Sequence, residues 1–317
     1  YEFLDWKMQV NSAVAEDNFA AHNAYVGRRA SVGDGAYIEN AYVIGYSVIE
    51  KGAVLSHVRV CDRHIPVDTV LHGTELTDGR YVVRIYGVED NPKGKYPGDV
   101  PFLGTTLEKL MEKNGIDPSD LWDDDESYLW FACLYPVCDS HEAALDAAAV
   151  LYRMAQGTAS PEEIRKWKES ERMSLYSSFN SADIAAAHRW EGELENRVLT
   201  KRFVWALEEG NYYQDALEIF GKRGISEEIF HILEQDAQEA DFSLKIRIYY
   251  ALSRYMKHTG TSYEMMQYDA LETECFGTIQ KAVYNSARKN LPDSSGYRIG
   301  KDRVDVALPV RVNWGGG

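Results

Sequence analysis

Aliphatic residues recur every six positions near the start of this chain. The repeated positions are Val14, Ala20, Val26, Val32, Ile38 and Ile44. Small or branched side chains stand four positions after some of them, at Ala30, Ala36 and Val48. Such a repeat is typical of a left-handed parallel β-helix, in which three short strands form one triangular coil, the aliphatic side chain points inward and a small one fits the corner. We therefore expect a β-helix over residues 1–64.

The repeat has one break, because Ile49 follows Ile44 after only five residues. This break predicts a bulge or a shifted corner at that point. Three hexads form one coil, so the visible repeat makes two or three coils, close to the minimum of roughly three repeats for a stable stack. The apolar ends of such a short stack must be covered, and we expect a homo-oligomer to help cover them.

Residues 65–139 show a different pattern of alternating strands and turns. The run Leu71–Tyr86 predicts a hairpin, since an Asp-Gly pair at 78–79 lies between two β-branched and aromatic segments and can supply the positive φ angles of a tight turn. Leu107–Asn114 predicts a short helix with its apolar side chains on one face, ended by Gly115. We interpret this region as a β-rich extension with a short helix.

Residues 140–291 have the signals of an α-helical connector domain. Ser160–Glu163 places a capping hydroxyl, a first-turn proline and a capping-box carboxylate in order. Apolar residues at helical spacing predict packed helical hairpins: Phe203, Leu207, Ala216, Leu217, Phe220, Ile229, Ile232 and Leu233. The same stripes could form a groove for a partner, although core packing is their more common use. Strand character returns at Arg303–Val312, within a final segment 292–317.

Composition excludes several functional classes. The formal charge of −16 argues against nucleic-acid binding, because a negative surface repels the phosphate backbone. Four cysteines in 317 residues are too few for a secreted disulfide framework, so we expect a cytoplasmic protein. Their spacing does not suggest a zinc site. No apolar run reaches about 18 residues, so we expect no membrane span.

The only segment whose residue types suit phosphoryl transfer lies at the end of the chain. No phosphate-binding loop of the G-x-x-x-x-G-K-[ST] type and no G-x-S-x-G elbow occurs. A terminal strand instead carries Arg311 and Asn313 into Gly315, Gly316 and Gly317, and glycines allow a backbone to approach a ligand closely. On composition alone, these glycines could equally be a frayed end.

Several segments resemble one enzyme family in the same order along the chain. They are His72–Arg80, Val83–Lys93, Phe102–Leu107, Asp120–Trp122, Leu129–Pro136 and the terminal Pro309–Gly317. The first five closely resemble the middle region of bifunctional L-fucokinase/fucose-1-phosphate guanylyltransferases. The last looks like the opening motif of that family's kinase domain, which is of the GHMP type. The resemblance covers nearly the whole chain.

The resemblance implies that the parent protein is a transferase of L-fucose salvage. It would phosphorylate L-fucose with ATP and couple fucose-1-phosphate to GTP, releasing GDP-fucose and pyrophosphate. Arg311 would lie beside the transferred phosphoryl group, with Asn313 and Gly315–Gly317 bordering the fucose pocket. The nucleotide loop of the guanylyltransferase would precede this chain, and the kinase phosphate loop and Mg²⁺ site would follow it. We therefore expect a central scaffold that binds no cofactor and is inactive alone.

Two other functional classes stay open at this point. One is a hexapeptide-repeat acyltransferase, in which His22 or His57 acts as a base between neighbouring coils. The number of coils and the long helical segment do not favour it. The other is a non-catalytic helical scaffold that binds proteins, although no 34-residue period is present to support tandem helical repeats.

Overall fold

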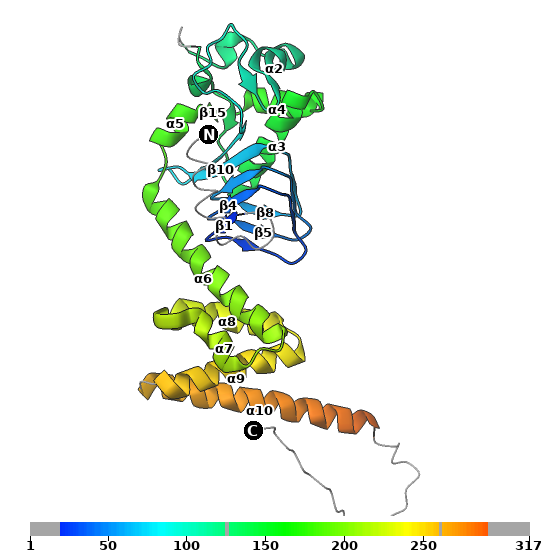
Figure 1. The fold of residues 1–317 in the computed structure, drawn as a ribbon, viewed down its shortest axis with the longest axis vertical. Helices are drawn as coiled ribbons and strands as arrows, with labels where there is room; N and C mark the ends of the chain where they lie inside the picture. Colours follow the sequence, from blue (N-terminus) through cyan, green and yellow to red (C-terminus); the bar gives the residue numbers. More distant parts are fainter. Residues whose placement is uncertain (1–19, 124–126, 260–261, 291–317) are drawn as a thin grey trace, which may run out of the picture. The chain divides into compact units, whose positions relative to one another are not determined.

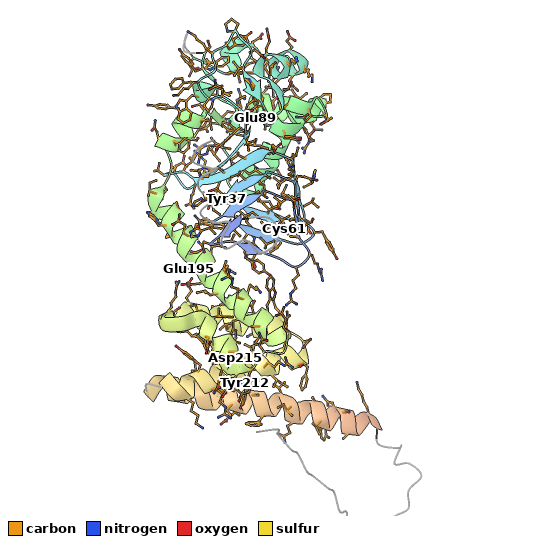
Figure 2. The ribbon with its side chains drawn as sticks, in the orientation of Figure 1. Tyr37, Cys61, Glu89, Glu195, Tyr212 and Asp215 are labelled. Carbon is orange, nitrogen blue, oxygen red and sulfur yellow. The ribbon has the colours of Figure 1, made fainter. Side chains whose placement is uncertain are left out.

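The computed structural model describes residues 20–123, 127–259 and 262–290. Its first part is a β-solenoid built from short parallel strands on three faces (Figure 1). The first face contains β1 (Ala20–His22), β4 (Tyr37–Glu39), β7 (Val54–Ser56) and β10 (Thr69–Glu75). The second contains β2 (Tyr25–Val26), β5 (Tyr42–Ile44) and β8 (Arg59–Cys61), and the third contains β3 (Ser31–Val32), β6 (Val48–Ile49) and β9 (His64–Ile65). Figure 2 labels Tyr37 on the first face and Cys61 on the second.

Each coil of the solenoid is shorter than three full hexads. Ile38 pairs with Leu55, 17 positions later, and Leu55 pairs with Leu71, 16 positions later. One residue is lost at the corner that follows each strand of the first face, because a single residue in the left-handed region turns the chain there: Asn23 (φ 44°), Asn40 (φ 45°) or His57 (φ 52°). The second coil loses one more residue between Val60 and Ile65, where Asp62 has a φ of 51°. A short polar side chain such as that of asparagine tolerates this conformation better than most.

The shortened corner corrects the predicted inward positions. Val43 is fully buried and in register with the buried Val60, whereas Ile44 is only half-buried. The repeat therefore steps by five residues between Ile38 and Val43, one strand before the break expected at Ile49. Because a one-residue slip sends every later side chain to the other face, the small corner residue is Ser47, which is fully buried, and not the exposed Val48. For the same reason, Ala21 rather than Ala20 is in register with Ile38.

The predicted corner residues Ala30 and Ala36 do pack against the core. In the corrected register, a small or β-branched side chain stands two positions before most of the inward aliphatic ones. The fully buried members of this set are Ala36, Ala41, Ser47, Ala53 and Val58. The hexapeptide repeat thus identifies the solenoid correctly and misplaces one of its corners. Val14, the first predicted repeat position, lies outside the described residues.

A long hairpin extends the first face of the solenoid. β10 pairs in parallel with β7 and antiparallel with β11 (Tyr81–Gly87), which confirms the predicted hairpin. At its turn, Gly79 has a φ of 83°, while Asp78 is not among the residues with positive φ, so glycine alone supplies the left-handed conformation. Next come β12 (Pro101–Phe102) and β13 (Thr105–Thr106).

The predicted helix of the extension is α2 (Leu107–Asn114). The Thr106 side chain accepts a hydrogen bond from the Lys109 amide at its start, and Gly115 ends it with a φ of 59°. Both ends therefore follow the expected capping chemistry. The remaining short elements here are η2 (Pro118–Asp120), η3 (Leu129–Phe131) and β14 (Tyr135–Pro136).

Helices pack against this β-rich part without a break in the core. α3 (His141–Gln156) packs on β11, and its Leu145 and Ala148 share one core with Leu71 and Ile85. This contact covers the end of the solenoid that follows its last coil. α4 (Pro161–Glu169) begins with the predicted capping box, in which Glu163 accepts a hydrogen bond of 2.7 Å from the Ser160 amide.

The chain then returns to the β-rich part and leaves it again. β15 (Arg172–Met173) pairs with β14, and α5 (Leu175–Asn180) and the long α6 (Ile184–Glu208) follow. Next are α7 (Tyr213–Leu217), η4 (Glu218–Arg223) and α8 (Glu227–Glu239). Phe203 of α6 lies 5.3 Å from Phe220 between ring centroids, so the predicted apolar stripe is packed core.

The described residues from 240 onward form a second compact unit, in which α9 (Phe242–Thr259) and α10 (Ser262–Asn290) pack against each other. Ile248, Leu252 and Leu271 are buried within it. The predicted strand at Arg303–Val312 lies outside the described residues. Across those that are described, we find no helix whose length and apolar character would let it cross a membrane. All four cysteines are free thiols.

Candidate functional site

The residues predicted to serve the kinase cannot be located. Arg311, Asn313, Gly315, Gly316 and Gly317 all lie outside the described residues. Among the described ones, a network of polar side chains lies on the first face of the solenoid, at the corner that follows its strands.

Side chains in register form a polar row across the first face. The pairs His22–Glu39, Glu39–Ser56, Ser56–His72 and His72–Arg84 are each directly opposite on neighbouring strands. Strand side chains alternate between the two faces, and the neighbouring Ile38, Leu55 and Leu71 are inside the solenoid. The row His22, Glu39, Ser56, His72 and Arg84 therefore points outward from five adjacent strands. We refer to these five residues as the polar row.

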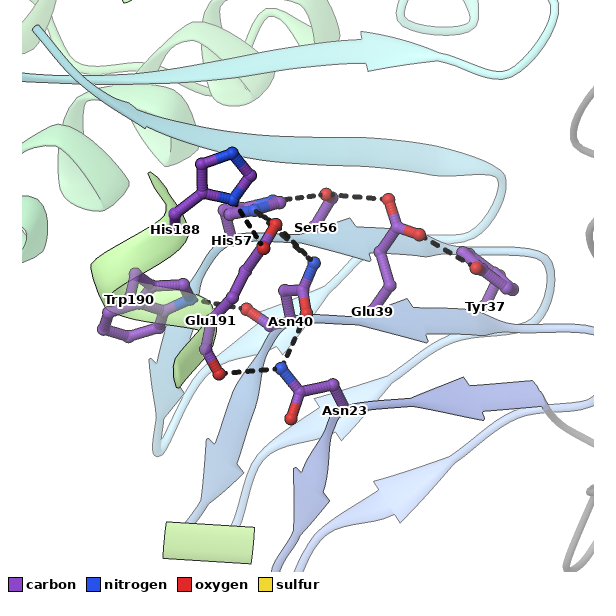
Figure 3. A network of polar contacts seen from close by, with 9 residues as sticks. All are labelled: Asn23, Tyr37, Glu39, Asn40, Ser56, His57, His188, Trp190 and Glu191. Carbon is purple, nitrogen blue, oxygen red and sulfur yellow. Dashed lines mark hydrogen bonds and ion pairs between the residues drawn. The ribbon is translucent and has the colours of Figure 1, made fainter. Parts of the chain in front are cut away.

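Hydrogen bonds link the middle of the polar row to a histidine at the corner (Figure 3). The Tyr37 hydroxyl donates to Oε2 of Glu39 at 2.9 Å, and the Ser56 hydroxyl donates to Oε1 of the same carboxylate at 3.0 Å. Nδ1 of His57 lies 2.9 Å from Oγ of Ser56. A continuous chain of polar contacts therefore runs from Tyr37 to His57.

The corner itself is a stack of polar side chains from successive coils. Nδ2 of Asn23 donates to Oδ1 of Asn40 at 2.8 Å, and Nδ2 of Asn40 stands 3.5 Å from Nε2 of His57. The fourth position of the stack is Gly73, where an added Cβ would lie 2.2 Å from the carbonyl oxygen of His57. Sequence reasoning missed this stack. Its signal is the recurrence of Asn23, Asn40 and His57 every 17 residues.

Helix α6 lies across the polar corner and closes it. Trp190 donates its indole N–H to the Asn40 carbonyl at 2.7 Å, and Nδ2 of Asn23 donates to the Glu191 carbonyl at 3.0 Å. Oε1 of Glu191 accepts from Nε2 of His57 at 3.1 Å, and its Oε2 lies 3.2 Å from Nδ1 of His188. Burial raises the pKa of the Glu191 carboxyl, but the hydrogen bonds from the two histidines outweigh it and lower the pKa overall.

Capping fixes where α6 begins and so which side chains reach the corner. The Asp183 carboxylate accepts from the Ala186 amide at 3.0 Å, and the Asp183 amide donates to the Glu75 carbonyl at 2.9 Å. The helix start is thus tied to the end of β10. Two turns later, Trp190 and Glu191 stand over Asn40 and His57 (Figure 3).

Two pockets flank the polar corner. One of about 620 Å³ is lined by His22, Asn23, Asn40 and Glu191, with further residues of α6. The other, of about 450 Å³, is lined by residues that include His57 and the His72 and Arg84 end of the polar row. In the described ranges, no group of three or more His, Cys, Asp or Glu side chains is arranged to hold a metal ion.

The two histidines considered for acyl transfer have different surroundings. His22 lines the larger pocket. His57 lines the smaller pocket, and its two ring nitrogens contact Ser56 and Glu191. To act as a general base, His57 would first have to release one of these contacts. The geometry gives His57 a role in joining the solenoid to α6.

Comparison with known proteins connects this architecture to one family. Residues 2–140 match the family described as the fucose pyrophosphorylase domain, so the solenoid and its β-rich extension are the matched part. The chain is also 27% identical over 284 residues to the bifunctional fucokinase/GDP-fucose pyrophosphorylase of Arabidopsis thaliana. That alignment covers 81% of this chain and 26% of the plant protein, so the chain spans about a quarter of the relative's length.

No solved structure matches the chain. The likeness of the chain to this family therefore rests on two findings. One is the family match, which ends at residue 140, and the other is the longer alignment, which covers helical residues as well. Together these two findings confirm the resemblance that the sequence motifs indicated, to the bifunctional fucokinase/GDP-fucose pyrophosphorylases.

Proposed function

We propose that this chain is the central part of a bifunctional enzyme of L-fucose salvage. The complete polypeptide would form fucose-1-phosphate from L-fucose and ATP, and then GDP-fucose and pyrophosphate with GTP. The match of residues 2–140 to the fucose pyrophosphorylase domain is the observation that carries this proposal. The alignment with the plant enzyme, which extends over 81% of the chain, supports it.

We propose that the chain is a scaffold between two catalytic parts. Its proposed domains are a left-handed solenoid at 1–64, a β-rich extension at 65–139, a helical connector at 140–291 and the start of a GHMP-type kinase at 292–317. The solenoid and α3 share one continuous core, which would make such a scaffold rigid and so favours this role. Arg311 would stabilise the transferred phosphoryl group, and Asn313 with Gly315–Gly317 would border the fucose.

ATP, GTP and Mg²⁺ would bind in the catalytic parts of the complete polypeptide. Across residues 20–123, 127–259 and 262–290, no side-chain cluster offers three His, Cys, Asp or Glu ligands to a metal. Free thiols at all four cysteines support a cytoplasmic location. A coupled assay tests the scaffolding role: the 317-residue chain should show no fucose-dependent consumption of ATP, and turnover by this chain would refute it.

We also propose that the helical unit 240–317 contributes to a homo-oligomer interface. Large apolar side chains are exposed on α10, with Phe276 at 52%, Val283 at 62% and Tyr284 at 63%. Their spacing of seven and eight residues puts them on one side of the helix. Light scattering should detect a dimer or larger assembly that Val283→Glu weakens. A monomer at high protein concentration would contradict this part of the proposal.

A further inference from the structure

An arginine is buried at one end of the polar row. Arg84 is only 1% exposed, and its Nη2 donates to the hydroxyl of Thr74. Within the part of the chain that the structure describes, its Nε and Nη1 have no hydrogen-bond partner. The guanidinium carbon lies 4.1 Å from the centre of the Phe179 ring, which covers one face of the group.

The charge of Arg84 has to be accounted for. Burial lowers its pKa to about 10, which still leaves the guanidinium protonated at neutral pH. A buried cation without a counter-ion is strongly destabilising, because the lost hydration is not replaced. The cation–π contact with Phe179 and the single bond to Thr74 leave Nε and Nη1 of the guanidinium unsatisfied.

Arg84 lines the pocket of about 450 Å³ beside the polar corner. This volume is in the range of sites that hold small organic ligands. Phe179, Ile184 and Trp190 give the pocket apolar walls, and His72 stands next to Arg84 across the strand pair. Phe179 is itself 47% exposed, so a rotation of its ring would open a path to the guanidinium.

The acidic groups near this pocket are already engaged or stand at its rim. Asp183 caps α6 and lies 3.8 Å from the guanidinium of Arg189. The Glu75 carboxylate is hydrogen-bonded to Tyr81, and Glu193 is exposed on α6. Desolvation lowers the pKa of the half-buried His141, which favours its neutral form. None of these groups provides the missing counter-charge to Arg84.

We propose that this pocket binds a small phosphorylated molecule, with its phosphoryl oxygens accepting from the unpartnered N–H groups of Arg84. In a guanidinium, Nε–H is parallel to one Nη2–H on one edge and Nη1–H is parallel to the other Nη2–H on the second edge, so the unpartnered Nε and Nη1 leave a free donor on each edge that suits phosphate. The organic part of the ligand lies against Phe179 and Trp190. None of the residues 309–317 proposed for the kinase is among those that line this pocket, and the inference holds independently of the proposed function.

Titration of the protein with three probes tests the site. Inorganic phosphate, a sugar 1-phosphate and a nucleoside monophosphate are compared by calorimetry and by thermal melting. We expect saturable binding and a raised melting temperature, with the organic phosphates binding more tightly than phosphate alone if the apolar walls contribute. In ¹⁵N NMR, the Nε–H signal of Arg84 should shift on addition of the ligand, a readout that requires no substitution.

Substitutions separate ligand binding from folding. Arg84→Met removes the charge and keeps an unbranched apolar stem, so it should weaken binding by about 30-fold or more while raising the melting temperature of the ligand-free protein. Arg84→Lys should bind with intermediate affinity. Arg80→Met is the matched control, because Arg80 is in the same hairpin and its guanidinium pairs with Asp78 and Glu171 outside the pocket.

Two results would overturn the proposal. One is an absence of saturable binding by any of the three probes together with an unchanged Arg84 signal. The other is a marked loss of stability in Arg84→Met with unaltered phosphate binding, which would mean that another segment of this chain neutralises the guanidinium.

Discussion

Nε2 of His57 lies 3.1 Å from Oε1 of Glu191, although the two residues are 134 positions apart in the sequence. This contact joins a corner of the β-solenoid to the second turn of α6. The nearby hydrogen bond from Trp190 to the Asn40 carbonyl, at 2.7 Å, reinforces it. These polar contacts at one corner therefore help to fix the orientation of α6 on the solenoid, together with the contact of Trp205 with Tyr25 further along the helix.

Removal of the Glu191 carboxylate should loosen α6. We expect Glu191→Ala to lower the free energy of unfolding by about 1 kcal/mol, a modest amount because the ion pair is partly exposed. It should also speed hydrogen exchange in the first turns of α6. Glu193→Ala, on the exposed side of the same helix, is the control and should change neither quantity. Equal effects of the two substitutions would contradict the role given to Glu191.

The period of six was sufficient to predict a solenoid, because alternation and coil geometry force aliphatic side chains inward at that spacing. It could not predict the five-residue step from Ile38 to Val43, since that step depends on the left-handed conformation of Asn40. The helix boundaries at Gly115 and Ser160 were predictable because capping is a local interaction. The corner stack depends on pairing between coils, and its one signal in the sequence is the recurrence of Asn23, Asn40 and His57 every 17 residues.

The corrected register makes a direct prediction for two adjacent residues. Val43→Ala removes methyl groups from the solenoid interior and should lower the free energy of unfolding by about 2 kcal/mol. Ile44→Ala deletes more carbon atoms but from a half-buried position, and should cost less than about 1 kcal/mol. Urea titration of both variants measures the difference. A larger loss of unfolding free energy from Ile44→Ala than from Val43→Ala would contradict the corrected register and favour the strict six-residue one.

Two glycines should respond in opposite directions to alanine. An added Cβ at Gly73 would lie 2.2 Å from the backbone carbonyl oxygen of His57, so Gly73→Ala should lower the free energy of unfolding by about 2 kcal/mol or more. Gly192 is within α6 and its Cβ would meet nothing within 4 Å. Gly192→Ala should raise helix stability by about 0.5–1 kcal/mol. Thermal melting compares the two, and a tolerated Gly73→Ala would contradict the close stacking at the corner.

Asp90 should make stability depend on pH. Burial raises the pKa of its carboxyl to about 6, although the amides of Gly87 and Leu103 donate to it. The folded form then holds the proton more tightly than the unfolded chain, whose carboxyl titrates near pH 3.9. Stability is therefore lost as the pH rises from about 4 to about 6, and the loss is complete above that range.

The Asp90→Asn variant isolates this effect, because asparagine does not titrate. Between pH 4 and pH 7, the free energy of unfolding of the wild type should fall by on the order of 1–2 kcal/mol relative to that of the variant. This value is reduced to allow for partial exposure of the carboxyl. Urea unfolding at several pH values gives the difference. A difference that is constant with pH, or that changes in the other direction, would rule out a raised pKa.

The candidate site was only partly predictable from residue types. His57 was singled out because histidine serves as a base in some hexapeptide-repeat enzymes, yet its partner Glu191 could not be identified, since their contact depends on how α6 packs. Arg84 gave no signal either, because an arginine in a strand is ordinarily exposed and its burial arises from the position of Phe179.

Formation of GDP-fucose tests the central claim most directly. The complete polypeptide that contains these residues is incubated with L-fucose, ATP and GTP, and the products are separated and identified by mass spectrometry. We predict GDP-fucose and pyrophosphate from the complete polypeptide and neither product from the 317-residue chain alone. A folded complete polypeptide that leaves L-fucose unchanged and makes no GDP-fucose from supplied fucose-1-phosphate would contradict the assignment to fucose salvage.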